Sequence, residues 1–94
     1  MRKDEQMAKF YVIHYTEQGR LPKLTPEQVP AMKQAMQDTL SKHPELTYNG
    51  TMFDPNTGIG VCDWDGPTAQ AVEDVMKALG VPYDAVVPVV PLTL

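Results

Sequence analysis

Short apolar runs and longer apolar stripes alternate along the chain, and each predicts a different kind of element. Runs rich in β-branched and aromatic residues, whose side chains alternate between two faces, predict four strands at residues 8–15, 46–53, 59–64 and 85–90. Apolar residues spaced three or four apart predict two helices at residues 25–42 and 67–79. The elements therefore follow the order strand, helix, strand, strand, helix, strand.

Turn and capping residues mark the ends of these elements. The segment 54–58 (DPNTG) consists of turn residues and predicts that the two middle strands form a hairpin. Thr25 and Gln28 have the spacing of a capping box at the start of the first helix, although Pro30 distorts or delays that first turn. Gly80 predicts a left-handed residue that ends the second helix.

Two strand-helix-strand units joined through a hairpin give the ferredoxin-like split β-α-β fold (βαββαβ). We expect an α+β domain over residues 8–94, preceded by a tail at residues 1–7, in which a four-stranded antiparallel sheet carries two helices on one face. The spatial strand order is then 4-1-3-2. Pro88 has no amide hydrogen, which agrees with a last strand at the sheet edge. Because the other sheet face needs cover, we expect a homodimer.

The hairpin turn also predicts which side chains share a face of the sheet. Setting the register from residues 54–58 pairs Asn49 with Asp63 and Thr51 with Val61. The face expected under the helices then holds Leu46, Tyr48, Met52, Cys62 and Trp64, and the open face holds Asn49, Thr51, Phe53, Ile59, Val61 and Asp63. A slip of the register by one residue would exchange the two faces.

Polar side chains among apolar neighbours on the open face are the candidate binding residues. We expect His14, Asn49 and Asp63 to contact a small ligand, with Tyr15 and Phe53 as walls of the site. If the ligand is a metal ion, His14 and Asp63 are the expected metal ligands. Antiparallel pairing separates His14 from Asp63 by more than ~10 Å along the sheet, so the two side chains would meet only across a dimer.

The remaining chemically active side chains favour a structural interpretation. Cys62 is the one cysteine of the chain, so it forms no disulfide within it, and the nearby Asp63 and Asp65 disfavour a reactive thiolate. We therefore expect Cys62 to be an inert core residue. Tyr48 and Trp64 are expected to pack against each other across the hairpin.

Composition and charge exclude several classes of partner. The chain has 94 residues, of which 43% are hydrophobic and 21% charged, as in an ordinary globular domain. Eight basic and twelve acidic residues give a net charge of -4, and no basic cluster offers a surface for nucleic acid or an anionic membrane. Because no apolar run approaches the ~20 residues of a membrane span, we expect a cytoplasmic protein.

Residues 53–87 resemble the second half of a family of small bacterial ferredoxin-like proteins of unknown function, which includes a nickel-responsive, nickel-binding, dimeric actinobacterial protein. The matching positions are Cys62, Pro67, Ala71, Val72, Gly80, Pro82 and Asp84. Many members of that family carry a histidine where this chain has Met76. More broadly, the chain is similar to the dimeric α+β barrels, a superfamily of cofactor-free monooxygenases, isomerases and ligand binders.

The resemblance implies nickel or zinc as the metal. We therefore expect a small cytoplasmic dimer that binds a small ligand or a divalent metal ion at the open sheet face, in a binding or sensing role. The α+β barrels imply an alternative, a cofactor-free isomerase or monooxygenase with His14 as base and Asp63 of a second copy orienting it. The residues leave open whether the protein is a binder or an enzyme.

Overall fold

The protein has the predicted ferredoxin-like split β-α-β fold, as seen in a computed structural model that describes residues 7–94. Its elements are β1 (Ala8–His14), α1 (Gln28–Ser41), β2 (Thr47–Phe53), β3 (Gly60–Gly66), α2 (Ala69–Leu79) and β4 (Ala85–Val89). The antiparallel sheet has the order β2-β3-β1-β4, which places β4 and its Pro88 at an edge as expected. Of the predicted tail at residues 1–7, all but Met7 lies outside the described residues.

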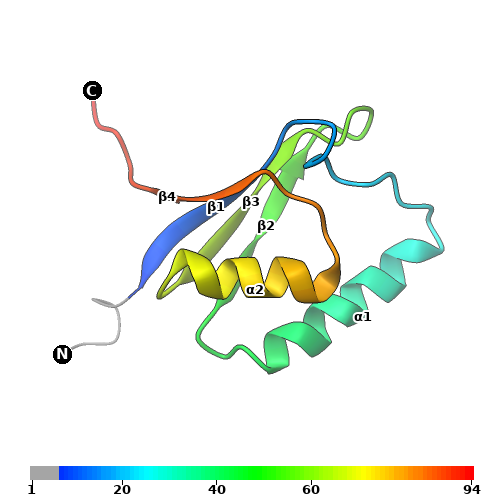
Figure 1. Ribbon diagram of the computed structural model, residues 1–94, viewed down its shortest axis with the longest axis horizontal. Coiled ribbons are helices and arrows are strands. Elements are labelled where there is room, and N and C mark those ends of the chain that lie inside the picture. Colours follow the sequence, from blue (N-terminus) through cyan, green and yellow to red (C-terminus); the bar gives the residue numbers. More distant parts are fainter. Residues whose placement is uncertain (1–6) are drawn as a thin grey trace.

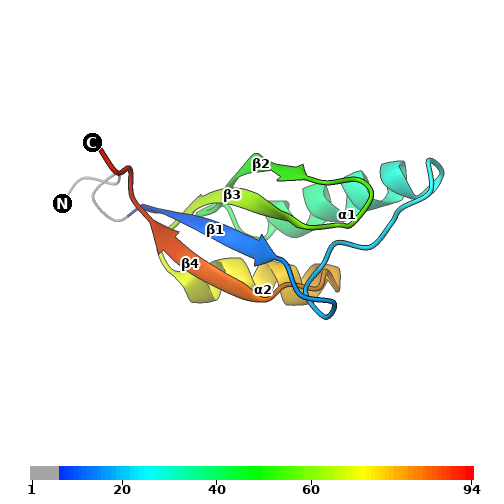
Figure 2. The same cartoon turned by 90° about the horizontal axis from the view of Figure 1, so that it is seen from above.

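Both helices lie on the same face of the sheet, which leaves the opposite face uncovered (Figures 1 and 2). The helix-covered face, here called the helix face, carries the side chains of Phe10, Val12, His14, Cys62 and Trp64. The uncovered face, here called the open face, carries Lys9, Tyr11, Ile13, Val61, Asp63 and Asp65 on the two central strands. The two faces therefore differ in chemistry as well as in cover.

Helix α2 supplies most of the helical part of the core. Its residues Val72, Val75 and Met76 are buried, and they cluster with Trp64 of β3, which is itself fully buried. The rings of Tyr48 and Trp64 lie 5.0 Å apart between centroids, which confirms that they pack against each other across the hairpin.

The ends of α2 follow the expected capping chemistry. The hydroxyl oxygen of Thr68 accepts a hydrogen bond from the amide of Ala71, which satisfies one of the unpaired amides at the helix start. Gly80 has a φ of 67°, the left-handed conformation that was predicted for it. Both ends of this helix are thus specified by local sequence.

Helix α1 begins later than its capping box predicts. The helix starts at Gln28, the residue before it is Glu27, and no side chain caps it, so Thr25 is not the cap. Half of the predicted box does form, because the Thr25 amide donates to Oε1 of Gln28 at 2.8 Å. Pro30 then falls within the first turn, where amides have no partner inside the helix and a missing hydrogen costs nothing.

A β-bulge in β2 makes half of the predicted hairpin register wrong. Tyr48 pairs with Trp64 as expected, but the pairing then shifts, so that Gly50 opposes Asp63 and Thr51 opposes Cys62. Gly50 has a φ of 118°, which only glycine adopts readily and which accommodates the extra residue. Thr51 and Phe53 therefore lie on the helix face, and Met52 lies on the open face, the reverse of what the turn alone predicts.

Candidate functional site

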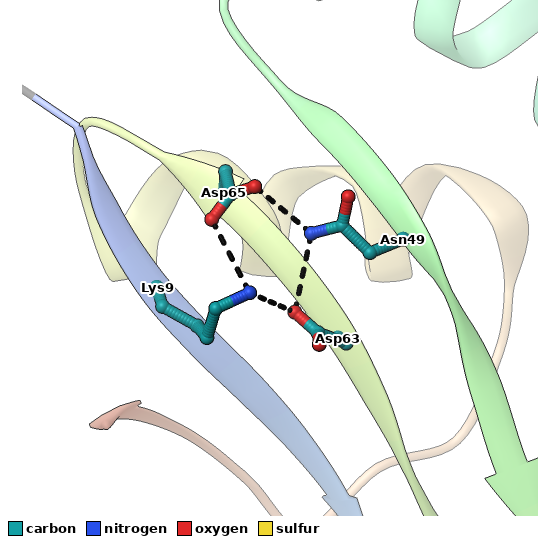
Figure 3. Close-up of polar contacts among 4 residues, drawn as sticks. All are labelled: Lys9, Asn49, Asp63 and Asp65. Carbon is teal, nitrogen blue, oxygen red and sulfur yellow. Dashed lines mark hydrogen bonds and ion pairs between the residues drawn. The ribbon is translucent and has the colours of Figure 1, made fainter. Parts of the chain in front are cut away.

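The polar residues of the open face form one hydrogen-bonded cluster of an ammonium group, two carboxylates and an amide (Figure 3). Nζ of Lys9 lies 2.8 Å from Oδ1 of Asp63 and 3.5 Å from Oδ1 of Asp65. The side-chain amide of Asn49 donates to both carboxylates, at 3.2 and 2.9 Å. The hydrogen bond from Lys9 lowers the pKa of Asp63, and the same bond raises the pKa of Lys9. Because the Lys9 ammonium group already bridges the two carboxylates and the Asn49 amide donates to both, the cluster is not a vacant cation site.

His14 does not lie on the open face, so the expected grouping of His14 with Asn49 and Asp63 is wrong for a single chain. His14 is fully buried on the helix face, and its partner in β3 is Gly60. Gly60 and Asp63 are an odd number of residues apart, and side chains alternate along a strand, so His14 and Asp63 point to opposite sides of the sheet. The structure brings together Asn49 and Asp63 but separates both from His14.

The contacts of the His14 ring determine which nitrogen carries hydrogen. Its Nδ1 lies 3.0 Å from the carbonyl oxygen of Gly19 and 2.8 Å from that of Pro82. Two acceptors can be satisfied only if Nδ1 is the donor, so the neutral ring has a bare Nε2. That Nε2 lies 3.3 Å from Sγ of Cys62. Within this chain, backbone carbonyls take the orienting role that the enzyme-like alternative gives to Asp63 of a second copy.

Cys62 links His14 to two hydroxyl groups on β2. Thr51 Oγ1 donates to Sγ of Cys62 at 3.0 Å, and the hydroxyl of Tyr48 makes a short hydrogen bond to Thr51. Burial raises the pKa of the Cys62 thiol, which is therefore protonated at neutral pH and can donate to Nε2 of His14. Burial likewise raises the pKa of Tyr48. The donors thus run in one direction, from Tyr48 through Thr51 and Cys62 to His14.

Three members of this polar chain, Tyr48, Thr51 and Cys62, line an apolar cavity of about 460 Å³ between α1, the segment before it and the β2–β3 hairpin, and they are here called its polar floor. The lining includes Leu24, Val29, Met32, Met36, Phe53 and Met76, together with Tyr48, Thr51 and Cys62. Phe53 was expected as a wall of an open-face site, and the bulge in β2 instead turns it toward this cavity. Its side chain is 52% exposed, so the cavity is open to solvent.

Tyr15, the other expected wall, follows the last residue of β1 and belongs to neither cluster. Its side chain is exposed, and its backbone amide donates to Oδ2 of Asp84 at 2.6 Å. The amide of Thr16 donates to the same oxygen at 2.9 Å, and the Thr16 hydroxyl also bonds to the carboxylate. These bonds lower the pKa of Asp84, with the Thr16 hydroxyl contributing most. Tyr15 therefore lies where the chain turns after β1, apart from the polar cluster of the open face.

Cys62 and Thr51 are the residues that sequence reasoning missed. Cys62 is buried as predicted, but its sulfur faces the His14 imidazole instead of apolar side chains alone. One signal was available: in an antiparallel pair of β1 and β3, Cys62 opposes Val12, which places it on the same face as His14. The sequence does not indicate that Thr51 lies on the helix face, because that placement depends on the β-bulge in β2.

The donor set on the helix face suits a borderline metal ion but does not enclose one. Within residues 7–94, no group of three or more histidine, cysteine, aspartate or glutamate side chains is placed to hold a metal ion. His14 Nε2 and Cys62 Sγ are two nitrogen and sulfur donors of the type that nickel and zinc accept. These two donors suit such an ion, but they are fewer than the ligands of a complete site, and both side chains are buried.

Comparison with known proteins finds one family and one close fold. The model of the family described as nickel responsive protein SCO4226-like matches residues 11–89. The crystal structure of SCO4226 from Streptomyces coelicolor A3(2) superposes with a TM-score of 0.65 at 26% sequence identity, covering 93% of this chain and 100% of that chain. No curated protein matches the chain. No helix in the described part of the chain is long and apolar enough to span a membrane.

Proposed function

Because the chain belongs to the family of nickel responsive proteins like SCO4226, we propose that it binds nickel or zinc in a binding or sensing role. The protein ligands we assign are Nε2 of His14 and Sγ of Cys62. This assignment replaces the open-face pair of His14 and Asp63, whose two members lie on opposite sides of the sheet.

One observation carries the proposal, namely the orientation of the His14 ring. The carbonyls of Gly19 and Pro82 hold Nδ1 in its protonated form, so the lone pair of Nε2 points toward Cys62. Metal-binding histidines are commonly oriented in this way, with the non-binding nitrogen donating to a carbonyl or carboxylate. The ring is thus arranged to bind before any metal arrives.

Metal binding at this pair would replace the proton of the Cys62 thiol. Cysteine binds metal as a thiolate, and burial raises the pKa of Cys62, so binding must release a proton. We therefore expect the affinity for metal to rise with pH over the range in which the thiol stays protonated. The role also requires a reduced cysteine, which suits the cytoplasm.

The proposal is tested by titrating metal-free protein with nickel while recording ultraviolet absorption. We expect a thiolate-to-nickel charge-transfer band that Cys62→Ser abolishes. Asp63→Asn is the matched control, because it changes a carboxylate on the opposite sheet face, and it should leave the titration unchanged. His14→Gln tests the second ligand, with circular dichroism to verify that this buried variant folds.

Two results would contradict the proposal. If Cys62→Ser binds nickel with unchanged affinity, the pair is not the site. If Asp63→Asn abolishes binding while Cys62→Ser does not, the metal site lies on the open face as the sequence first suggested.

We further propose that the protein forms a homodimer through the open face. Met52, Tyr11, Ile13, Val61 and Val87 give this face an apolar surface, and Met52 is 79% exposed. A sheet face of this kind is commonly covered by a second copy of the same face. Light scattering coupled to size-exclusion chromatography should give twice the monomer mass, and Val61→Lys should reduce it to that of the monomer. A wild-type monomer would contradict the proposal.

A further inference from the structure

The cavity beneath α1 has properties that metal binding does not explain. Its volume of about 460 Å³ lies within the roughly 300–1,000 Å³ of small-molecule sites. Leu24, Val29 and Phe53 line it and still expose more than a third of their surface, so apolar groups there remain in contact with water. We propose that this cavity binds an apolar alcohol or phenol, with its hydroxyl group at the polar floor.

The side chains that line the cavity are mostly apolar, and they indicate that most of the ligand is apolar. The cavity is lined by Met32 and Met36 of α1 and Met76 of α2, together with Leu21, Pro22 and Val81. Methionine side chains are flexible and adapt to ligands of different shape. An apolar molecule in the cavity would cover these side chains and remove their surface from water, which is favourable.

The direction of the hydrogen bonds at the polar floor indicates that the ligand carries a hydroxyl group. The proton of Thr51 is donated to Cys62, and the proton of Tyr48 is then left to bond Thr51. Both oxygens keep unused lone pairs, whereas their donors are already engaged. The floor therefore accepts hydrogen bonds, and a ligand that donates one is better matched than a ligand that can only accept.

The charges of the lining favour a neutral donor over a cationic one. No acidic residue lines the cavity among the described residues, and Lys23 is the one charged residue that does. A buried ammonium ion would lack a counter-ion and would be repelled by Lys23. An alcohol or phenol donates a hydrogen bond without carrying charge, which is why we choose this class.

The test is isothermal titration of chelator-treated, metal-free protein with 1-octanol, with 2-octanone, which is uncharged and can only accept a hydrogen bond, titrated in parallel. Because no metal is present, a failure here is independent of the nickel titration. We expect octanol to bind with 1:1 stoichiometry and roughly threefold to tenfold more tightly than 2-octanone. If 2-octanone binds as tightly as octanol, or if octanol does not bind, the proposal is overturned.

Two substitutions on α1 locate the binding. Val29→Trp places a large ring in the cavity at a position that is 43% exposed, and it should reduce octanol affinity at least tenfold. Gln34→Trp adds the same ring at an exposed position of the same helix outside the cavity lining, and it should leave the affinity unchanged. Equal affinities in the two variants would overturn the proposal, because binding would then be nonspecific.

Thr51→Val tests the polar floor with a side chain of similar shape. Loss of one hydrogen bond to the ligand should weaken octanol binding by roughly threefold to tenfold. The ratio of octanol to 2-octanone affinity should fall with it. If octanol affinity in Thr51→Val equals that of the wild type, the hydroxyl group does not bind at the floor.

Discussion

The two helices cover the same sheet face but contribute to it in different ways. Helix α2 buries Val72, Val75 and Met76 against β3 and β1. Helix α1 is longer, yet none of its residues is buried, and Met36 and Leu40 reach the core only in part. The α2 side of the molecule is therefore a packed core, whereas the α1 side covers a cavity.

The difference originates in the sequences of the two helices. Thr68 and Gly80 cap α2 at its two ends, and its apolar stripe buries Val72, Val75 and Met76. Helix α1 has no side-chain cap, carries Pro30 in its first turn, and presents methionines toward the sheet. A domain of this size has a small core, so concentrating stability on one side leaves the other side free to bind.

The largest expected effect comes from removing a large side chain on each side of the helix face. Trp64→Ala should lower the free energy of unfolding by about 3–5 kcal/mol, because Trp64 is fully buried beneath α2. Phe53→Ala, on the α1 side and 52% exposed, should lower it by less than about 1 kcal/mol. Urea denaturation followed by circular dichroism measures both.

If Trp64→Ala and Phe53→Ala lower the free energy of unfolding by the same amount, the α2 and α1 sides do not differ in packing as we infer. Because Trp64→Ala removes much of the core, Val75→Ala provides a milder second test at a buried position of α2. It too should destabilise the protein more than Phe53→Ala does.

A smaller effect is expected from the helix caps. Thr68→Ala removes the hydrogen bond to the Ala71 amide and should lower the free energy of unfolding by about 1 kcal/mol. Glu27→Ala alters the residue at the corresponding position of α1, where no side-chain cap exists, and should change stability by only a few tenths of a kcal/mol. Thermal unfolding of the two variants compares them directly. A larger loss in Glu27→Ala would show that α1 depends on a cap that the structure lacks.

The smallest effect is expected on the open face, and it depends on pH. The Lys9 hydrogen bond lowers the pKa of Asp63 from 3.8, so the pair contributes stability above that value and loses it as pH falls through the lowered pKa. Asp63→Asn should therefore be less stable than the wild type near pH 7, and the two should converge as pH falls below about 4.

Salt and alkali provide checks on the same pair. Both side chains are partly exposed, so added salt should reduce the difference between Asp63→Asn and the wild type. Asp63 raises the pKa of Lys9, so the contribution of the pair should also disappear as pH rises through that raised value. Glu17→Gln, which removes a charge from an exposed loop residue, is the control. A difference that grows as pH falls below about 4 would contradict the account.

The fold was predictable from sequence because its signals are local and agree with one another. The DPNTG turn, Gly80 and Pro88 each identified an element or its position, and the structure confirmed all three. The register of β2 was not predictable from the turn alone. A glycine inside a strand often marks a bulge, and Gly50 was that signal, but nothing in the alternation says on which residue the shift falls.

The candidate site was predicted only in part. The sequence identifies His14 as a candidate but does not identify Cys62 as its partner. A pattern of polar residues points to carboxylates such as Asp63 and not to a thiol that is predicted to be buried. Whether Cys62 is inert depends on what its sulfur faces, and that follows from the pairing of β1 with β3. Residue type alone does not indicate which side chain the Cys62 sulfur contacts.

The measurement that tests the central claim most directly is the ¹⁵N spectrum of the His14 imidazole, recorded with and without zinc. The structure predicts that Nδ1 carries hydrogen, because Gly19 and Pro82 accept from that nitrogen. Zinc should then shift the Nε2 resonance while Nδ1 keeps its hydrogen, and Cys62→Ser should weaken that response. A ring protonated at Nε2, or an Nε2 resonance that zinc leaves unchanged, would contradict the assignment of His14 and Cys62 as the metal ligands.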